Sequence, residues 1–349
     1  MLFRDNIERM TGYVPGEQTL DHSYIKLNTN ENPYPPSPAV STVLSDPEAL
    51  RLNRYPDPIA DTVRDAAAAV TGTEREWIIV GNGGDDLLTI AMRAFVNQGG
   101  RVAFFDPSYS LYPVLADIQG AVSVAVPLAD EFDLPHDVQD RIDGADLLFV
   151  TRPNAPSGNA FAIDRLAEIV TGFAGVVLID EAYTDFAADN CLDLVKRLPG
   201  LIILRTLSKG YSLAGIRLGY AVADPQLVEG MMKVKDSYNV NGITQRLAAA
   251  ALQDQTHMAA NVDRICVTRQ RTTDALAAMG FQVLPSQANF IFTRPPLPAA
   301  RFAQDLRDNG ILVRHFSDGR VKDYVRVSIG TDEEMDAFLN VTEKIVAGG

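Results

Sequence analysis

The feature that most constrains the fold is an alternation of short apolar runs with helical-looking segments between residues 77 and 222. The apolar runs are rich in β-branched residues, as buried strands of a parallel sheet are. Segments such as 85–97 and 164–173 separate them and indicate helices on both faces. We therefore predict an α/β fold with a large domain, whose mostly parallel seven-stranded sheet is flanked by helices. The predicted strands are residues 77–80, 101–105, 122–126, 146–150, 175–180, 201–205 and 218–222.

After about residue 223 the pattern changes to long helical segments followed by shorter strands, which predicts a smaller α+β domain. The first 50 residues are rich in Pro and Asn and indicate an arm rather than a core element. A length of 349 residues also fits two domains. We expect an N-terminal arm with part of the small domain at 1–50, a large domain at 51–240 and a small domain at 241–349. The later strands are predicted at 281–284, 288–292, 311–315 and 324–329.

The charge balance restricts the partners. Lys and Arg number 31 against 45 Asp and Glu, a formal net charge of −14, and there is no basic run. A chain this acidic repels nucleic acid and anionic membrane surfaces, so we expect neither as a partner. Small anions remain possible ligands for individual arginines and backbone amides.

Cysteine and histidine usage argues against a disulfide framework and a metal centre. Cys191 and Cys266 are too few and too far apart in sequence for either. The four histidines have no metal-ligand spacing. The chain start is charged, and no stretch approaches the roughly 18 apolar residues of a membrane span, so a cytoplasmic location is expected. The histidines are His22, His136, His257 and His315.

Ligands of open α/β sheets bind beyond the carboxyl ends of the strands, which makes the residues after each predicted strand the candidate site residues. Gly83 and Gly84 follow the first strand and run into a helix start, where N–H groups and the helix dipole favour a phosphate. An ordinary turn with Asp85 as N-cap residue fits the same sequence. Tyr109 follows the second strand and could stack on a flat ligand, although surface tyrosines are common there.

Two later strand ends carry further polar side chains. Asn154 lies in a Pro-rich loop, where it could donate to a ligand oxygen or only form a turn. Asp180 ends an apolar strand, where a carboxylate is costly unless a cation or a donor meets it. A protonated heteroaromatic nitrogen would satisfy this carboxylate, as would a nearby arginine.

Lys209 lies in the stretch "TLSKGYSLAGIR" after the sixth predicted strand. A lysine among small, turn-prone residues is commonly a solvated charge on a loop. It can instead form a Schiff base with a carbonyl when burial or another cation favours its neutral amine. Arg217 supplies such a cation, and its planar fork also suits a phosphate.

Together these residues match one cofactor. They offer an amine for an aldehyde, a carboxylate for a ring nitrogen, donors for a phenolic oxygen, and small residues, hydroxyls and an arginine for a phosphate. Pyridoxal 5′-phosphate carries all four groups, and its ring acts as an electron sink.

The sequence resembles the fold type I pyridoxal-phosphate-dependent aminotransferases and, among them, the histidinol-phosphate aminotransferases. The resemblance covers nearly the whole chain, and the order and spacing of its motifs make it specific. The motifs are "YVPGE" 13–17, "LNTNENP" 27–33, "RYPDP" 54–58, "GNGGDDLL" 81–88, "RPNAPSGN" 152–159, "DEAY" 180–183, "TLSKGYSLAGIRLGY" 206–220 and "VRVSIGT" 325–331.

The resemblance implies a role for each matching residue. Lys209 would bind the cofactor covalently, Asp180 would pair with the ring nitrogen, Asn154 and Tyr183 would contact the phenolic oxygen, and Tyr109 would stack on the ring. Lys209, Asp180 and Tyr183 would be the catalytic residues. The implied cofactor-binding residues are Gly83, Gly84, Asp85, Tyr109, Asn154, Asp180, Tyr183, Thr206, Ser208, Lys209, Arg217 and Tyr55.

The resemblance also implies how substrates and subunits are held. Arg326 would grip the substrate α-carboxylate bidentately, with Tyr13 and Arg314 toward the substrate's own phosphate. Tyr55 would reach the cofactor phosphate of a partner subunit, which implies a homodimer with shared active sites. The implied substrate-binding residues are Tyr13, Asn30, Asn154, Arg314 and Arg326.

The chain departs from the family pattern in one loop. The family's Asn-Pro-Asn-Asn-Pro-Thr-Gly reads Arg-Pro-Asn-Ala-Pro-Ser-Gly at 152–158, so the packing of this loop is expected to differ. Asp85 is also an acidic residue beside the expected phosphate, and we expect its backbone amide to make the contact.

The implied activity is a two-stage amino transfer between histidinol phosphate and 2-oxoglutarate, giving imidazole acetol phosphate and glutamate in histidine biosynthesis. An aromatic amino acid aminotransferase and a threonine-phosphate decarboxylase share the fold and most motifs. A non-catalytic sensor of pyridoxal phosphate would carry an additional DNA-binding domain ahead of these motifs. A nicotinamide dehydrogenase is disfavoured because "GNGG" lacks the G-x-G-x-x-G fingerprint.

Overall fold

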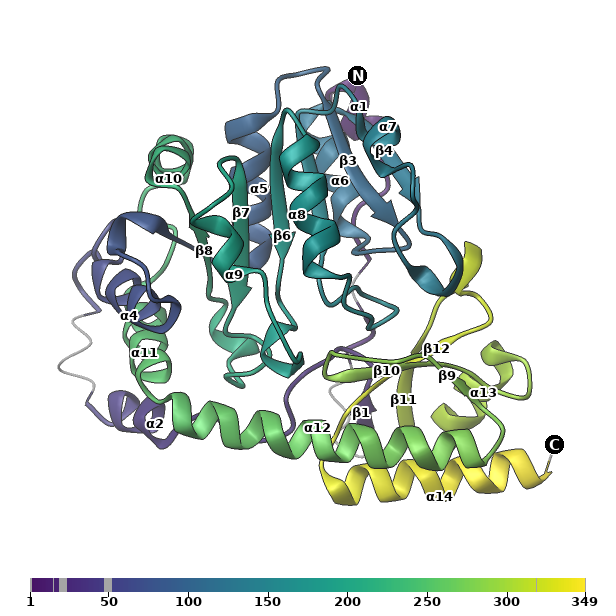
Figure 1. Cartoon of the computed structure of the whole chain (residues 1–349). Helices are drawn as coiled ribbons and strands as arrows, with labels where there is room; N and C mark the ends of the chain where they lie inside the picture. Colours follow the sequence, from purple (N-terminus) through teal and green to yellow (C-terminus); the bar gives the residue numbers. More distant parts are fainter. Residues whose placement is uncertain (1, 15, 19–23, 47–51, 318, 349) are drawn as a thin grey trace.

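The computed structural model describes residues 2–14, 16–18, 24–46, 52–317 and 319–348. Within these ranges the chain forms one sheet of seven strands and one of five, which lie in different parts of the molecule (Figure 1). No helix among the described residues has both the length and the apolar character needed to cross a membrane.

The larger sheet confirms the predicted α/β fold, and each of its strands lies where an apolar run predicted one. The strand order is β2-β8-β7-β6-β5-β3-β4. β8 is antiparallel to β2 and β7, whereas the other neighbours pair in parallel, so the sheet is mostly parallel. The strands are β2 (Ile78–Gly81), β3 (Arg101–Asp106), β4 (Val122–Pro127), β5 (Leu147–Thr151), β6 (Val176–Asp180), β7 (Leu201–Thr206) and β8 (Gly219–Ala223).

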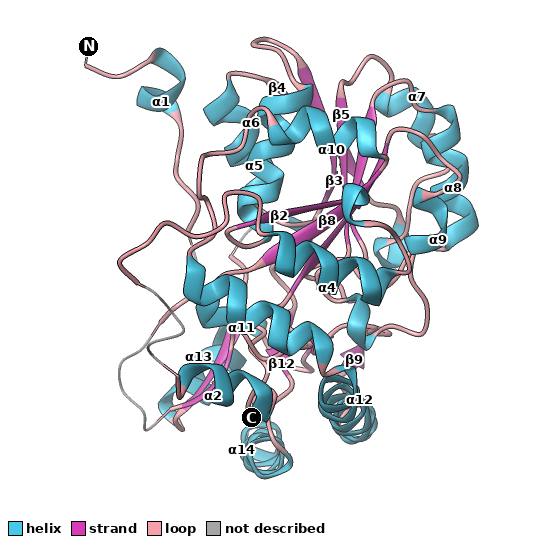
Figure 2. Ribbon diagram, turned by 90° about the vertical axis from the view of Figure 1, so that its left-hand side faces the viewer, coloured by secondary structure: helices cyan, strands magenta, loops and turns pink. Residues whose placement is uncertain are grey.

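Helices cover both faces of this sheet, as the alternation predicted (Figure 2). One face packs against α5 (Gly84–Phe95), α6 (Leu111–Gln119) and α10 (Pro225–Met232). The opposite face packs against a second group of helices. This group comprises α4 (Asp61–Thr71), α7 (Val138–Ile142), α8 (Ile163–Gly172), α9 (Leu192–Val195) and α11 (Gly242–Gln253).

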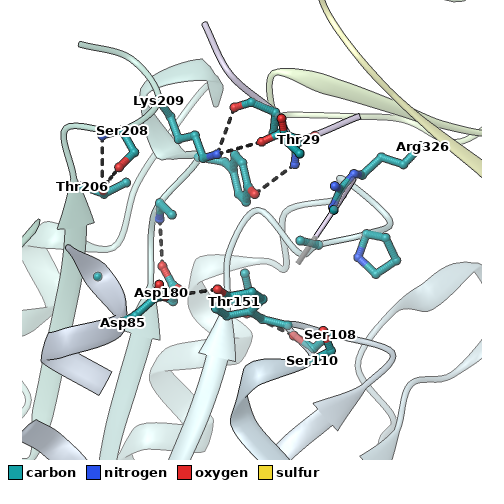
Figure 3. Close-up of a pocket in the computed structure, with 18 of the residues that line it drawn as sticks. Thr29, Asp85, Ser108, Ser110, Thr151, Asp180, Thr206, Ser208, Lys209 and Arg326 are labelled. Atoms are coloured by element: carbon teal, nitrogen blue, oxygen red, sulfur yellow. Dashed lines mark hydrogen bonds between the residues drawn. The ribbon is translucent and has the colours of Figure 1, made fainter. Parts of the chain in front are cut away.

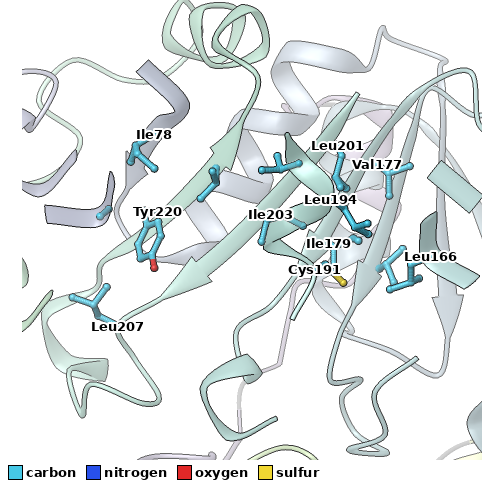
Figure 4. Packing of buried hydrophobic residues seen from close by; sticks show 14 of the residues in the cluster. Ile78, Leu166, Val177, Ile179, Cys191, Leu194, Leu201, Ile203, Leu207 and Tyr220 are labelled. Atoms are coloured by element: carbon cyan, nitrogen blue, oxygen red, sulfur yellow. The ribbon is translucent and has the colours of Figure 1, made fainter. Parts of the chain in front are cut away.

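Successive residues of each central strand belong to different cores. Val177 and Ile179 of β6 pack with Leu166 and Leu194 of the covering helices (Figure 4). Leu178 lies between them in sequence and packs in the core on the other face. This alternation follows from the pleat of a strand, which sends neighbouring side chains to opposite faces. The same alternation between the two faces continues to the carboxyl ends of the strands. It therefore determines which polar side chains there point toward the functional site.

The smaller sheet has the order β1-β11-β12-β10-β9 and confirms the strands predicted after residue 280. The predicted long helical segment divides at Asp254, whose side chain accepts a hydrogen bond from the backbone N–H of His257 and caps the second helix. The small-sheet strands are β1 (Ile25–Leu27), β9 (Gln282–Val283), β10 (Phe290–Arg294), β11 (Ile311–His315) and β12 (Val325–Ser328). The helices beside them are α12 (Gln255–Ala278), α13 (Ala299–Asp308) and α14 (Asp332–Gly348).

The expectation that the first 50 residues contain no core element is wrong for β1. This strand pairs in parallel with β11, and Leu27 is buried. Its partner lies nearly the whole chain away, so local composition gives no sign of the pairing. The predicted boundary at residue 50 lies outside the described residues, and the division at residue 240 stays a prediction. The N-terminal region also contains α1 (Asp5–Arg9) and α2 (Pro38–Leu44).

Short 3-10 turns complete the described secondary structure. They are η1 (Arg75–Trp77), η2 (Asp130–Phe132), η3 (Thr184–Phe186), η4 (Ala214–Ile216) and η5 (Gly319–Val321).

Candidate functional site

A cavity of about 280 Å³ opens where the carboxyl ends of the large-sheet strands approach the small sheet and the N-terminal arm. Its wall combines residues that lie far apart in sequence (Figure 3). Most of the residues predicted for the site line it. These are Tyr13, Asn30, Gly84, Asp85, Tyr109, Asp180, Tyr183, Thr206, Ser208, Lys209, Arg217, Arg314 and Arg326.

Lys209 follows β7 and extends its amine into this cavity (Figure 3). Its Nζ donates to the backbone oxygen of Asn30 at 2.9 Å and to that of Thr29 at 3.4 Å. Burial, together with the positive charge of Arg326, lowers the pKa of Lys209 to about 8. A substantial fraction of the amine is therefore neutral near physiological pH, which a nucleophile for a carbonyl carbon requires. The interpretation of Lys209 as a solvated loop charge does not fit this environment.

Asp180 ends β6 on the cavity side and is almost entirely buried. One carboxylate oxygen accepts the backbone N–H of Ala182 at 3.0 Å, and the other accepts the Tyr112 hydroxyl at 3.4 Å. Among the described residues no cation forms an ion pair with it. Burial raises the pKa of Asp180 to about 7. An N–H cation entering the cavity would remove this cost, as the ring nitrogen of pyridoxal phosphate can.

The start of α5 and the loop after β7 form an anion cradle. Gly83 is the N-cap residue of α5 with φ 90° and no side-chain cap, so the first N–H groups of the helix are free for a ligand. A Cβ atom at Gly83 would lie 2.7 Å from Nη2 of Arg217. The same guanidinium donates from Nη1 to Ser208 Oγ at 3.3 Å, and Thr206 Oγ1 donates to Ser208 Oγ at 3.0 Å. The alternative with Asp85 as N-cap is wrong.

The Asp85 carboxylate is turned to other partners. One oxygen accepts the Tyr109 hydroxyl at 3.1 Å, and the other lies 3.4 Å from Nη2 of Arg217. With the carboxylate engaged in this way, the contact of the Asp85 backbone amide with a phosphate stays a prediction. Burial raises the pKa of Tyr109, so its hydroxyl stays protonated. Its ring meets Tyr13 edge-on, with the ring centroids 5.9 Å apart.

Two arginines lie side by side on adjacent strands of the small sheet at the other end of the cavity. Arg314 of β11 and Arg326 of β12 are register partners, and both guanidinium groups lie over the ring of Phe316. Arg326 donates from Nη2 to the backbone oxygen of Asn28, whereas its buried Nε has no partner. No carboxylate of the described residues forms an ion pair with either arginine. The pair therefore forms a positively charged end suited to a carboxylate or a phosphate.

Three predicted residues do not line the cavity. Gly83 lies against the guanidinium of Arg217. Tyr55 is 82% exposed and stacks on Tyr238 with the ring centroids 4.7 Å apart. Asn154 is completely buried, and its Nδ2 donates to the backbone oxygen of Pro107 and to Ser157.

The wall near Asn154 is instead formed by Ala155, which stands where the related loop has asparagine. The Asn154 amide is already committed within its own loop. Its predicted contact with the phenolic oxygen therefore stays a prediction that requires these bonds to rearrange.

Sequence inspection missed several polar and aromatic residues of the wall. Ser108 lies directly before Tyr109 and donates to Thr151 and to Asn154. Ser108 follows the end of β3, as Tyr109 does, and residues at such strand ends are candidate ligand-binding residues. Phe316 lies two residues after Arg314 and could have been found from strand alternation. The missed wall residues include Gln18, Thr29, Ser108, Ser110, Thr151 and Phe316.

These groups fit pyridoxal phosphate. Lys209 offers the amine, Asp180 is a buried carboxylate without a cation, and Ser208 and Arg217 converge with the start of α5 into an anion cradle. The distribution matches the aldehyde, the ring nitrogen and the phosphate of that cofactor. The fold and the site thus define a pyridoxal-phosphate enzyme of the aminotransferase type.

Comparisons with known proteins agree with this class. The sequence profile of the aminotransferase class I and II family matches residues 22–341. The histidinol-phosphate aminotransferase of Geobacter sp. strain M21 is 44% identical over 347 residues, covering 99% of both chains. That of Geotalea uraniireducens is 44% identical over 344 residues, covering 98% of this chain and 99% of the relative.

A solved structure extends the likeness to three dimensions. The crystal structure of histidinol-phosphate aminotransferase from Sinorhizobium meliloti in complex with pyridoxal-5′-phosphate has a TM-score of 0.90 and 25% sequence identity, over 99% of this chain and 98% of that one. The chain therefore belongs to the class I and II aminotransferases and, among them, to the histidinol-phosphate aminotransferase family. It is a pyridoxal-phosphate-dependent transaminase.

Proposed function

We propose that the protein interconverts histidinol phosphate and 2-oxoglutarate with imidazole acetol phosphate and glutamate, a step of histidine biosynthesis. The observation that carries this proposal is the pair Arg314 and Arg326, which faces the cavity without a carboxylate partner among the described residues. Both amino donors of the reaction are anionic near Cα, because histidinol phosphate carries a phosphate ester there and glutamate a carboxylate. Two adjacent guanidinium groups can serve both anions. The names of the relatives support the same substrate.

The protein's own residues supply positioning and proton transfer. Bound pyridoxal phosphate supplies an aldehyde that captures the substrate amine and a ring that withdraws electrons from Cα. Lys209 would take the proton from Cα as general base and return one as general acid, roles that its pKa of about 8 suits. Asp180 would keep the ring nitrogen protonated, and Tyr183 would donate to the phenolic oxygen. Arg326 would hold the α-carboxylate of glutamate, while Tyr13 and Arg314 would lie toward the phosphate of histidinol phosphate.

A homodimer with shared active sites is part of this proposal. Tyr55 is far from buried in the single chain, and its neighbours Leu52 and Ile59 are also exposed, at 70% and 39%. If a partner subunit covers this face, the Tyr55 hydroxyl would enter the partner's active site. There we expect it to contact the cofactor phosphate. Biosynthesis of an amino acid and two unpaired cysteines support a cytoplasmic location.

An aromatic amino acid aminotransferase is the second candidate. Tyr13, Tyr109 and Phe316 line the cavity and could surround an aromatic side chain as well as an imidazole. Arg314 distinguishes the candidates, because the phosphate dianion of histidinol phosphate can engage both guanidinium groups, whereas the single α-carboxylate of an aromatic amino acid needs only Arg326. The Arg314→Gln variant should therefore lose at least about tenfold in kcat/KM for histidinol phosphate and much less for tyrosine.

The direct test uses purified, cofactor-loaded protein mixed with histidinol phosphate in the absence of any oxo acid. We expect rapid bleaching of the visible cofactor band, and its return when 2-oxoglutarate is added. Bleaching by tyrosine or phenylalanine but not by histidinol phosphate would move the enzyme to the aromatic branch. Release of carbon dioxide from threonine phosphate, offered in place of histidinol phosphate, would show a decarboxylase instead.

A further inference from the structure

Asn30 occupies the junction between the N-terminal arm, the large sheet and the small sheet. It is buried and has a left-handed backbone with φ 55°, which non-glycine residues rarely adopt. Its surroundings must therefore hold it in place. The site residues Lys209 and Tyr183 both contact it.

The small-domain side fixes both the backbone and the amide of Asn30. Its N–H donates to Ser328 Oγ at 2.8 Å, and the Ser328 hydroxyl donates back to Asn30 Oδ1 at 3.0 Å. Asn289 Nδ2 donates to the backbone oxygen of Asn30 at 3.0 Å. The Ser328 hydroxyl proton finds its acceptor in Oδ1, so these bonds direct the Nδ2 group to the opposite side.

On that opposite side, Asn30 Nδ2 donates to the Tyr183 hydroxyl oxygen at 3.0 Å. The hydroxyl is thereby an acceptor toward Asn30, and its own proton has no acceptor among the described residues. Tyr183 lines the cavity, and burial raises its pKa, so the hydroxyl keeps that proton. The proton is available to an acceptor inside the cavity. The backbone oxygen of the same Asn30 accepts from Lys209 Nζ at 2.9 Å.

We propose that Asn30 is a positioning residue: its amide occupies the Tyr183 hydroxyl as a donor and so directs the Tyr183 proton into the cavity. The inference rests on the proposed function, in which Tyr183 donates to the phenolic oxygen of the cofactor. It assigns the Asn30 side chain to this task rather than to substrate contact, because Tyr183 and Ser328 already engage both ends of its amide. Ser328 lies two residues after Arg326 on β12, so the strand that holds the substrate anion also holds this amide.

Two substitutions at Asn30 separate the amide from the backbone. Asn30→Gly accepts the left-handed backbone and keeps the carbonyl toward Lys209, but it removes the donor to Tyr183. Asn30→Asp keeps the shape and replaces the donor by a carboxylate oxygen, which would draw the Tyr183 proton away from the cavity. Both changes weaken donation to the phenolic oxygen. Without that donor, the negative charge on the phenolic oxygen of the cofactor stabilises the protonated Lys209 nitrogen beside it more strongly. The pKa of this nitrogen should therefore rise.

The readout is the pH titration of the visible band of the cofactor-loaded protein, without substrate. We expect the midpoint to rise by about half a pH unit to one unit in Asn30→Gly and by more in Asn30→Asp. Ser328→Ala, which loosens the amide, should shift it in the same direction by less. The control Asn309→Asp places the same change on an exposed helix end, where Asn309 Nδ2 donates to the backbone oxygen of Asp305, and should titrate as the wild type does.

A wild-type midpoint in both Asn30 variants would overturn the inference, even if their thermal stability or turnover fell, because that pattern describes a structural role only. The titration needs bound cofactor and no amino donor. A wrong donor in the proposed function would therefore leave the expected shifts intact, and the two failures are distinguishable.

Discussion

Asp180 and Glu181 are neighbours in sequence, but the pleat sends their carboxylates to opposite faces of the large sheet. Asp180 faces the cavity, has no cation among the described residues, and has a pKa raised by burial to about 7. Glu181 faces the other side, where it is fully buried and pairs with Arg205 at 2.7 Å. One of its oxygens also accepts the backbone N–H of Cys191 at 2.6 Å.

The difference separates a functional carboxylate from a structural one. The Glu181 and Arg205 pair joins the ends of β6 and β7, and its two charges compensate each other without a ligand. The Asp180 carboxylate has no positively charged partner among the described residues, and the protonated ring nitrogen of the cofactor would supply one. Buried carboxylates with a strongly shifted pKa and no counter-ion are typical of functional sites. Because Asp180 and Glu181 are adjacent, the two carboxylates can be compared at the same place in the fold.

The largest expected effect comes from Asp180→Asn. The amide keeps the size of the side chain but cannot hold the ring nitrogen in its protonated form. We expect turnover to fall by about 10²-fold to 10³-fold, measured as kcat with saturating cofactor. Turnover within threefold of the wild type would mean that Asp180 is not the partner of the ring.

Glu181→Gln should have the opposite effect: a large loss of stability with little loss of turnover. It leaves the buried Arg205 without its counter-ion, and breaking such a pair costs about 3 to 5 kcal/mol. We expect this loss in the free energy of urea unfolding of the cofactor-free protein, with kcat nearly unchanged below the transition. The matched control is Glu229→Gln, whose pair with Lys233 is 74% and 70% exposed and whose loss should cost at most about 1 kcal/mol. A large loss of kcat at full stability in Glu181→Gln would erase the distinction between the two carboxylates.

The smallest effect is a pH dependence of stability that Asp180 should cause below about pH 7. Its folded pKa of about 7 lies above the ordinary 3.8, so the folded protein takes up a proton that the unfolded chain does not hold. Ionised Asp180 therefore destabilises the cofactor-free protein above about pH 7, and stability returns as the pH falls through 7 toward 4. Asp180→Asn should remove this slope and raise the unfolding free energy at about pH 8 by roughly 1 to 3 kcal/mol. Bound cofactor should suppress the slope in the wild type.

Asp185 supplies an internal check on that measurement. Burial raises its pKa to about 6, so a second and lower step should persist in Asp180→Asn. If the variant retained the wild-type slope between about pH 6 and pH 7, where Asp185 is already ionised, Asp180 would not be the titrating group.

The local sequence was sufficient to predict the large sheet and several cavity residues that follow its strands. Strands such as 175–180 and 201–205 are continuous apolar runs, and ligand-binding residues of an open α/β sheet follow such runs. Lys209 and Asp180 were therefore predictable from position and chemistry. Recognised motifs then added Arg326 and Tyr13, which no local pattern marks.

The rest of the site depends on contacts between distant segments. The pairing of β1 with β11 brings Asn30 against Ser328, 298 residues away in sequence. The burial of the Asn154 amide depends on Pro107 and Ser157 together. Neither arrangement has a periodic signature, because each is decided by which donors and acceptors remain free after the sheets have packed.

The measurement that tests the central claim most directly is the location of the covalent cofactor bond. Borohydride reduction of the cofactor-loaded protein fixes that bond, and peptide mass spectrometry then identifies the modified lysine. We predict a single pyridoxyl-phosphate modification on Lys209, absent from Lys209→Ala and unchanged in a variant of the exposed Lys233. Modification of another lysine, or none in a protein that transaminates, would contradict the account.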